Sequence, residues 1–379
     1  MRPSCPPLPP VRAVAALVAP SLGRALGLGV ALVLAAGCAP APSIERAAGP
    51  SPAAGDGSAA SATAAASAPA GTDVARRPVT VLLDWVPNTN HTGLYVAAAA
   101  GYFEAAGLDV RIVAPGEVYG EQAVVGGAAD FAVSFQENLT LARARGVPAV
   151  SIAAILQHDT SAFATLAERG VDGPAELAGL RYGAFGSPSE KPTLDALMQC
   201  SLGGAEIQPV EMVEIGLADP LALLAERRID VAWIFEGWQG IQAERAGIDL
   251  SLIRLSEHRD CIPDYYTPIL IASEATVAQR PDLARAFVGA VARGYADAIA
   301  DPAAAAEVLL AAAPELDAGL VRQSQAWLAP RYRDDAPRWG EQSEAVWAAY
   351  GRWLAGRGVI DAPIDAAAAF TNAFLPPAE

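Results

Sequence analysis

The sequence predicts an α/β fold built as two lobes and followed by a helical C-terminal segment. From Val79 onward, short β-branched runs alternate with Ala- and Leu-rich helical runs, a pattern typical of mostly parallel sheets. After about Ile271 this alternation ends and only helical runs follow. The chain has 379 residues, which is enough for two ordinary domains.

Each element is predicted from its own run of residues. Strands are expected where β-branched or apolar residues cluster between turn residues, and helices where Ala and Leu dominate. The strands are Val79–Leu83, Asp109–Val113, Phe131–Ser134, Val150–Ile155, Arg181–Ala184, Val210–Glu214, Val231–Phe235 and Leu250–Arg254. The helices are Leu94–Ala106, Tyr119–Gly126, Glu137–Ala144, Pro192–Cys200, Asp219–Glu226, Gly237–Ala246, Gln279–Ala300, Pro302–Ala313, Leu316–Ala326, Gln342–Ala355 and Asp365–Ala373.

We expect these elements to form two lobes from a discontinuous chain. Residues 79–178 together with 268–379 are expected to form lobe 1, and residues 179–267 are expected to form lobe 2. The long helix near residue 290 illustrates the C-terminal pattern, because Pro281 lies at its start and Leu283, Phe287 and Val291 share one face.

Residues 1–38 are expected to be a signal peptide and not part of the fold. Three Arg precede an apolar run, Ala25–Ala36, which is too short to span a bilayer as a stable helix. The run ends in "LAAGC", and small residues directly before Cys38 are typical of a lipoprotein signal that leaves lipid on this Cys. An ordinary secretory signal cut further on is the alternative. Both kinds of signal predict an exported protein. The lipoprotein signal also predicts that lipid holds the protein on the cell membrane, either in the periplasm or at the cell surface.

Residues 39–78 are expected to be a disordered tether between the anchor and the globular body. They are almost entirely Ala, Pro, Ser, Gly and Thr and contain no aromatic residue, so they cannot bury enough surface to offset chain entropy. The formal net charge of the chain is -16, which argues against a nucleic-acid partner because no basic surface is available to neutralise phosphates.

Five stretches at the ends of predicted strands collect aromatic and polar residues. They are "DWVPNTNH", "VSFQEN", "YGAFGSPSEK", "WIFEGWQG" and "DYYTP". In open α/β sheets, ligands bind at the carboxyl ends of the strands. With Tyr119 added, the candidate ligand-binding residues are Asp84, Trp85, Asn88, Asn90, His91, Tyr119, Gln136, Glu137, Gly186, Ser187, Glu190, Trp233, Glu236, Trp238, Tyr265 and Tyr266.

These residue types suit a flat, hydrogen-bonding heterocycle. Aromatic faces offer stacking area, and carboxylates and amides bind ring nitrogens and exocyclic amines. A carboxylate placed between aromatics, as in Glu236, is costly unless it meets a donor, which an aminopyrimidine would supply. Each residue also has a purely structural alternative: Trp85 and Trp233 as core residues, His91 as a turn residue, and Glu137 as the acidic first turn of a helix.

The sequence predicts neither a metal site nor a cofactor. No CxxC or HxxxH spacing occurs, and the absence of a GxxxxGK[ST] loop indicates that this chain does not hydrolyse ATP. Cys200 and Cys261 lie in the body, where they either pair as a disulfide or remain two buried thiols; the sequence leaves both open.

The motifs "LDWVPNTNHTGLYVA", "GYFEAAGLDV", "GSPSEK", "IFEGW" and "DYYTP" resemble the thiamine-pyrimidine-precursor-binding proteins of bacterial ABC importers. The resemblance runs from about Val79 to Pro330. It implies a type II periplasmic-binding-protein fold whose two lobes close a cleft over an aminomethyl- or hydroxymethylpyrimidine-type ligand without altering it. It also implies an ABC permease and a separate ATPase as partners.

Two other functions remain open. Riboflavin-binding importer lipoproteins have closely similar loops, so riboflavin is the alternative ligand. The resemblance also extends to a pyrimidine synthase, which uses a Lys for pyridoxal phosphate, a nearby His and a Cys-rich run. Here Ser134 stands at the Lys position and Asn138 at the His position, and the Cys-rich run keeps only Cys261. Since a Schiff base needs a lysine amine, we expect a binding protein and not an enzyme.

Overall fold

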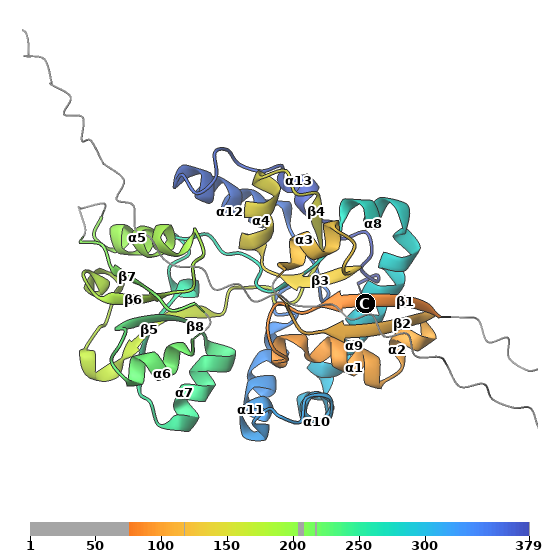
Figure 1. The fold of residues 1–379 in the computed structure, drawn as a ribbon, viewed down its shortest axis with the longest axis horizontal. Coiled ribbons are helices and arrows are strands. Elements are labelled where there is room, and N and C mark those ends of the chain that lie inside the picture. The colour runs from red at the N-terminus through yellow and green to blue at the C-terminus, as the bar shows by residue number, and fades with distance from the viewer. Residues whose placement is uncertain (1–75, 117, 204–207, 217, 379) are drawn as a thin grey trace, which may run out of the picture. The chain divides into compact units, whose positions relative to one another are not determined.

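The computed structural model describes residues 76–116, 118–203, 208–216 and 218–378 (Figure 1). The predicted signal peptide, the lipidation site Cys38 and nearly all of the tether lie outside these residues. Within the described ranges, no helix is both long and apolar enough to cross a membrane.

Sheet A is formed by both early and late segments of the chain. Its strands are β1 Arg77–Leu82, β2 Leu108–Val113, β3 Phe131–Ser134, β4 Ala149–Ala154 and β10 Ile269–Ser273. They lie in the order β2-β1-β3-β10-β4. β1 runs parallel to β2 and β3, whereas β10 runs antiparallel to β3 and β4. The strand that returns from sheet B is therefore inserted inside sheet A.

The helices of this part of the chain pack against the strands of sheet A or against one another. They are α1 Thr92–Ala99, α2 Tyr102–Ala105, α3 Gly120–Val125, α4 Gln136–Ala144, α8 Glu274–Gln279, α9 Pro281–Ala300 and α10 Pro302–Ala312. Phe287 of α9 stacks on Phe131 of β3 with ring centroids 4.0 Å apart. A Cβ at Gly294 would lie 2.0 Å from the carbonyl oxygen of Gly93, so α9 contacts α1 backbone to backbone.

Sheet B contains the middle of the chain. Its strands are β5 Ser161–Leu166, β6 Arg181–Ala184, β7 Glu211–Glu214, β8 Val231–Phe235 and β9 Leu250–Arg254, in the order β7-β6-β8-β5-β9. β6 is parallel to β7 and β8, and β5 is antiparallel to β8 and β9. Its helices are α5 Glu190–Ser201, α6 Pro220–Ala225 and α7 Ile241–Ala246, and a π-helical turn, η4 Glu236–Gly240, leads from β8 into α7.

The C-terminal helices are α11 Ala318–Leu328, α12 Glu344–Gly356 and α13 Ala366–Ala369. They contact elements of both sheets. Trp353 of α12 donates through Nε1 to the carbonyl of Cys261 at 3.0 Å, and α11 packs on η4 beside sheet B and on α10 beside sheet A. The helical C-terminal segment expected from the sequence is thus confirmed (Figure 1).

The α/β fold with two sheets is confirmed, and all eight predicted strands occur within about two residues of their expected ends. The sequence missed β5 and β10, which are the two antiparallel strands. The predicted helix Leu94–Ala106 is interrupted, because Gly101 adopts a φ of 71° between α1 and α2. Because β5 pairs within sheet B, we propose that the crossover between lobes lies between β4 and β5, and not at residue 178 as the sequence suggested.

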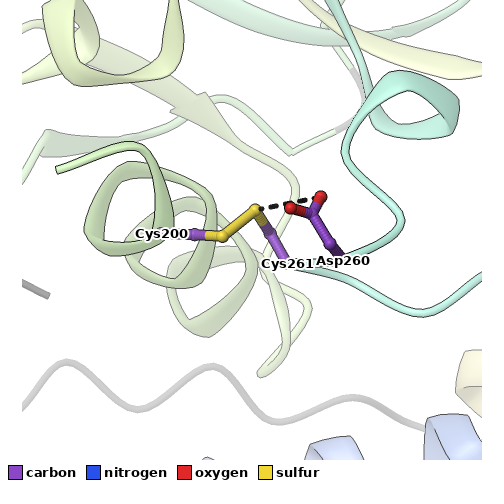
Figure 2. A group of neighbouring side chains, drawn as sticks. All are labelled: Cys200, Asp260 and Cys261. Carbon is purple, nitrogen blue, oxygen red and sulfur yellow. Dashed lines mark hydrogen bonds between the residues drawn. A yellow bond between two sulfur atoms is a disulfide. The ribbon is translucent and has the colours of Figure 1, made fainter. Parts of the chain in front are cut away.

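Cys200 and Cys261 form a disulfide, which answers the question the sequence left open. The bond ties the end of α5 to the segment between β9 and β10 (Figure 2). Asp260 lies 3.6 Å from the Cys261 sulfur. The two sulfurs are bonded to each other, so neither carries a proton or offers a thiolate. In the oxidised protein, Cys261 therefore donates no hydrogen bond to Asp260, and the three residues do not form a metal site.

Candidate ligand-binding site

The β1 loop, residues 83–91, is organised around a buried histidine. Nδ1 of His91 accepts from the Asn88 amide at 3.2 Å, which leaves the ring proton on Nε2, 2.6 Å from the Asp84 carboxylate. Oδ1 of Asn88 accepts from the Asn90 amide at 2.9 Å. His91 is completely buried, so its ring, Asp84 and Asn88 shape the loop, in line with the structural alternative for His91.

This folding of the β1 loop leaves Trp85 at the surface. Its side chain is 42% exposed, although a large aromatic residue is normally buried. Seven large hydrophobic side chains are exposed among the described residues, and five of them follow the carboxyl ends of β1, β2 and β6. These five, called here the apolar rim, are Trp85, Val86, Val118, Tyr119 and Phe185. Exposed apolar side chains that follow strand ends are candidates for contact with a ligand or partner.

The β6 loop, Phe185–Ser189, is held by two buried carboxylates. Glu190 accepts from the amides of Phe185 at 2.9 Å and Ser187 at 2.6 Å. Glu137, at the start of α4, accepts from the hydroxyls of Ser187 and Ser189, each at 2.5 Å. Because α4 follows a strand of sheet A and the β6 loop follows a strand of sheet B, Glu137 joins the strand ends of the two sheets.

Burial raises the pKa of Glu137, against the hydrogen bonds from Ser187 and Ser189 that lower it. The charge of Glu190 adds to the rise. Among the described residues, Glu137 accepts only from hydroxyl groups. A stronger donor, such as an amino group of a ligand, can therefore replace one of these hydroxyls.

A second polar group gathers beside Glu137. The Gln136 side chain accepts from the Tyr266 amide at 2.8 Å, while its buried Nε2 has no partner among the described residues. Burial raises the pKa of Asp159 to about 6, against hydrogen bonds from Ser161. Burial and then the charge of Asp159, with further contributions from Tyr350 and Glu137, raise the pKa of Tyr265. Gln136 thus offers an amide donor, and Glu137 and Asp159 offer two carboxyl groups.

The β8 turn, η4, differs from the sequence interpretation. Glu236 accepts from Nε of Arg254 at 2.8 Å, so its donor comes from β9 and does not require a ligand. Trp238 packs with the apolar residues of α10 and α11. Trp233 is buried and its ring centroid lies 5.1 Å from that of Phe163, as expected of a core residue.

The candidate residues therefore divide into three groups. Trp85 and Tyr119 lie exposed on the rim, Gly186 and Ser187 lie in the β6 loop, and most of the remainder are buried by contacts within the chain. Tyr265 stacks on Tyr350 at 4.5 Å, and the Tyr266 hydroxyl accepts from the Ser343 amide at 2.8 Å.

Sequence reasoning missed five residues that now join this region. They are Val86, Phe185, Ser189, Val118 and Asp159. The first three lie inside the motifs selected from the sequence, where attention to polar chemistry passed over them. The glycine after Phe185 was the signal available in the sequence for a sharp turn at this point. Gly186 indeed has a φ of 97° and turns the chain after β6. Two surface cavities of about 410 and 240 Å³ lie on sheet B and include none of these loops.

A family model described as "NMT1/THI5 like" matches residues 88–305, more than half of the chain. The chain belongs to the NMT1/THI5-like family. The formylaminopyrimidine-binding protein of Halalkalibacterium halodurans is 30% identical over 80% of this chain and 92% of that protein. The riboflavin-binding protein RibY of Chloroflexus aurantiacus is 27% identical over 79% of this chain and 86% of that protein.

The NMT1/THI5-like family also includes relatives named as synthases. One of them, the 4-amino-5-hydroxymethyl-2-methylpyrimidine phosphate synthase of Legionella pneumophila, is 26% identical over 79% of this chain and 92% of that protein. Among solved structures, the alkanesulfonate-binding protein SsuA of Xanthomonas axonopodis pv. citri superposes with a TM-score of 0.59 at 14% identity, covering 78% of this chain and 98% of that one. The chain thus has the two-lobed periplasmic-binding-protein fold.

Proposed function

We propose that this protein is the extracytoplasmic substrate-binding component of an ABC importer and that its ligand is a pyrimidine precursor of thiamine. The supporting observation is the apolar rim, because five of the seven large hydrophobic side chains that are exposed in the described part of the chain follow strand ends. A planar ring would stack on Trp85, and its amino and ring-nitrogen groups would meet Glu137 and Gln136.

The bridge between Glu137 and the β6 loop supports binding by lobe closure. It joins groups from the two sheets through short hydrogen bonds to Ser187 and Ser189. Closure of this kind would present one surface to a permease, with a separate ATPase driving transport. Lipid attachment at Cys38 and the tether of residues 39–78 remain predictions that suit this role. The formylaminopyrimidine-binding relative, which aligns over most of both chains, supports the pyrimidine class.

Riboflavin is the second candidate ligand. The apolar rim spreads over three loops, from Trp85 to Tyr119 and Phe185, which favours a larger ring system than a single pyrimidine. The riboflavin-binding relative supports the same alternative.

A synthase of the pyridoxal-phosphate type finds little support in the geometry. Ser134, at the position where the resemblance expects a lysine, donates its hydroxyl to buried Glu121. Lys191, the only lysine of the sequence, lies on α5 and pairs with Asp195 at 2.5 Å. The chain therefore lacks a lysine amine at that strand end, and we propose binding without chemistry.

Tryptophan fluorescence titration tests the proposal. Formylaminopyrimidine, hydroxymethylpyrimidine, thiamine and riboflavin are added separately to the protein, and a saturable change is expected with one of the first two. Val86→Ala on the rim should weaken that response, while Val125→Ala, an exposed valine at the end of α3, should leave it unchanged. No response to any of the four ligands would refute vitamin uptake, and a response to riboflavin alone would select the second candidate.

A further inference from the structure

Helix α11 contacts the strand-end loops of both sheets through one buried hydroxyl. Oγ of Ser324 donates to the carbonyl of Gly237 in η4. The same oxygen lies 2.5 Å from Oγ1 of Thr89 in the β1 loop. A carbonyl can only accept, so the single proton of Ser324 is used on Gly237 and the Thr89 hydroxyl must donate to Ser324. A directed chain therefore runs from Thr89 through Ser324 to Gly237.

Both ends of this hydrogen-bond chain are tightly packed, so a shift of one end is transmitted to the other. Thr89 and Ser324 are completely buried. A Cβ at Gly237 would lie 2.8 Å from the ring of Trp327 on α11, so the backbone of η4 rests directly on this helix. On the other side, the Tyr332 hydroxyl donates to the Thr89 carbonyl at 2.6 Å.

A charged contact supports the same connection at the start of α11. Asp317, which caps the helix by accepting from the Leu320 amide at 2.6 Å, also accepts from Arg245 of α7 at 2.9 Å. Gly319 has no side chain, and a Cβ there would lie 2.3 Å from the Arg245 guanidinium. Both ends of α11 thus contact the segment that follows β8.

We infer that α11 is a strap that couples the β1 loop to the β8 turn, with Ser324 as the positioning residue. The inference deepens the proposed function and rests on it for its meaning, because the β1 loop carries the exposed Trp85 and the β8 turn follows a strand end of sheet B. Ligand contact on the sheet A side would then be transmitted to the sheet B side through a hydroxyl that touches no ligand.

The matched pair Thr89→Val and Thr89→Ser tests the strap in the full chain. Valine keeps the shape and loses the donor, while serine keeps the donor. Amide hydrogen exchange, followed by mass spectrometry without ligand, should rise in residues 236–240 with Thr89→Val and stay near wild type with Thr89→Ser. Thr276 of α8 forms a comparable buried hydroxyl pair with Ser273 of β10 at 2.9 Å, so Thr276→Val is the control and should leave residues 236–240 unchanged.

Unchanged exchange of residues 236–240 in Thr89→Val, or an equal rise in Thr276→Val, would overturn the strap. This readout needs no ligand, so it separates failure of the strap from failure of the proposed function. Where a ligand is found, Thr89→Val should weaken its binding about 2- to 10-fold, the range of one hydrogen bond, while Thr89→Ser should retain it.

Discussion

The β1 loop and the β8 turn were selected from the sequence by the same criterion, yet the structure uses them differently. Both follow the carboxyl end of a strand, and both contain a tryptophan near a carboxylate. In the β1 loop, Asp84 binds His91 within the loop and Trp85 is left 42% exposed. In the β8 turn, Glu236 pairs with Arg254 and Trp238 packs under α10 and α11. The partner that each polar residue finds decides whether the neighbouring aromatic residue remains available.

The largest expected effect comes from removing the centre of the β1 loop. His91→Ala leaves a cavity and two unpaired buried groups, and should lower the free energy of unfolding by roughly 2–5 kcal/mol. Chemical denaturation measures the loss. His258→Ala, at a half-exposed position, is the control and should cost less than about 0.5 kcal/mol. Equal losses in the two variants would show that His91 does not organise the loop.

Asp159 should make stability depend on pH. Its folded pKa of about 6 exceeds its ordinary value of 3.8, so the folded protein binds the proton more tightly. The stabilisation is complete below pH 3.8 and is lost as pH rises through 6. It amounts to at most about 3 kcal/mol. Denaturation between pH 4 and 7 should show this fall in wild type and a flatter profile in Asp159→Asn. Identical profiles would place the titration elsewhere.

Gly237→Ala tests the close packing of the β8 turn. The added methyl would meet the Trp327 ring at 2.8 Å and should destabilise the protein by about 1–3 kcal/mol. Gly240→Ala, three residues along the same turn, would place its methyl no closer than 3.6 Å to any atom and serves as the control. Thermal unfolding distinguishes the two. A stable Gly237→Ala variant would mean that the turn moves freely against α11.

Comparison of the two tryptophans gives the smallest but most specific effect. Trp85→Ala should weaken ligand stacking by roughly 0.5–1.5 kcal/mol and leave the unfolding midpoint almost unchanged, because the side chain is exposed. Trp238→Ala should show the reverse, with lower stability from lost packing on α10 and α11. Fluorescence titration and denaturation of both variants provide the measurement. The same pattern in both would remove the distinction between the loop and the turn.

The sequence predicted the eight strands with clear β-branched runs because their pattern is local. It missed β5, whose run "SAFATL" has a single β-branched residue, and β10, whose short apolar run "ILIAS" stands directly before a helix; both pair antiparallel with strands distant in the chain. In the candidate site, too, local features were predictable and long-range partners were not. Strand-end position was predictable for Trp85 and Glu137, whereas the orientation of Glu236 and Tyr265 depends on Arg254 and Tyr350, which local sequence cannot assign.

The bond between Cys200 and Cys261 carries a practical consequence for how this protein is made. It closes a loop with a sequence separation of 61 residues, which in a chain-entropy treatment stabilises the folded state by about 4 kcal/mol. Material produced in a reducing cytosol would lack that contribution. Recombinant preparations therefore call for an oxidising host compartment and for storage without thiol reagents.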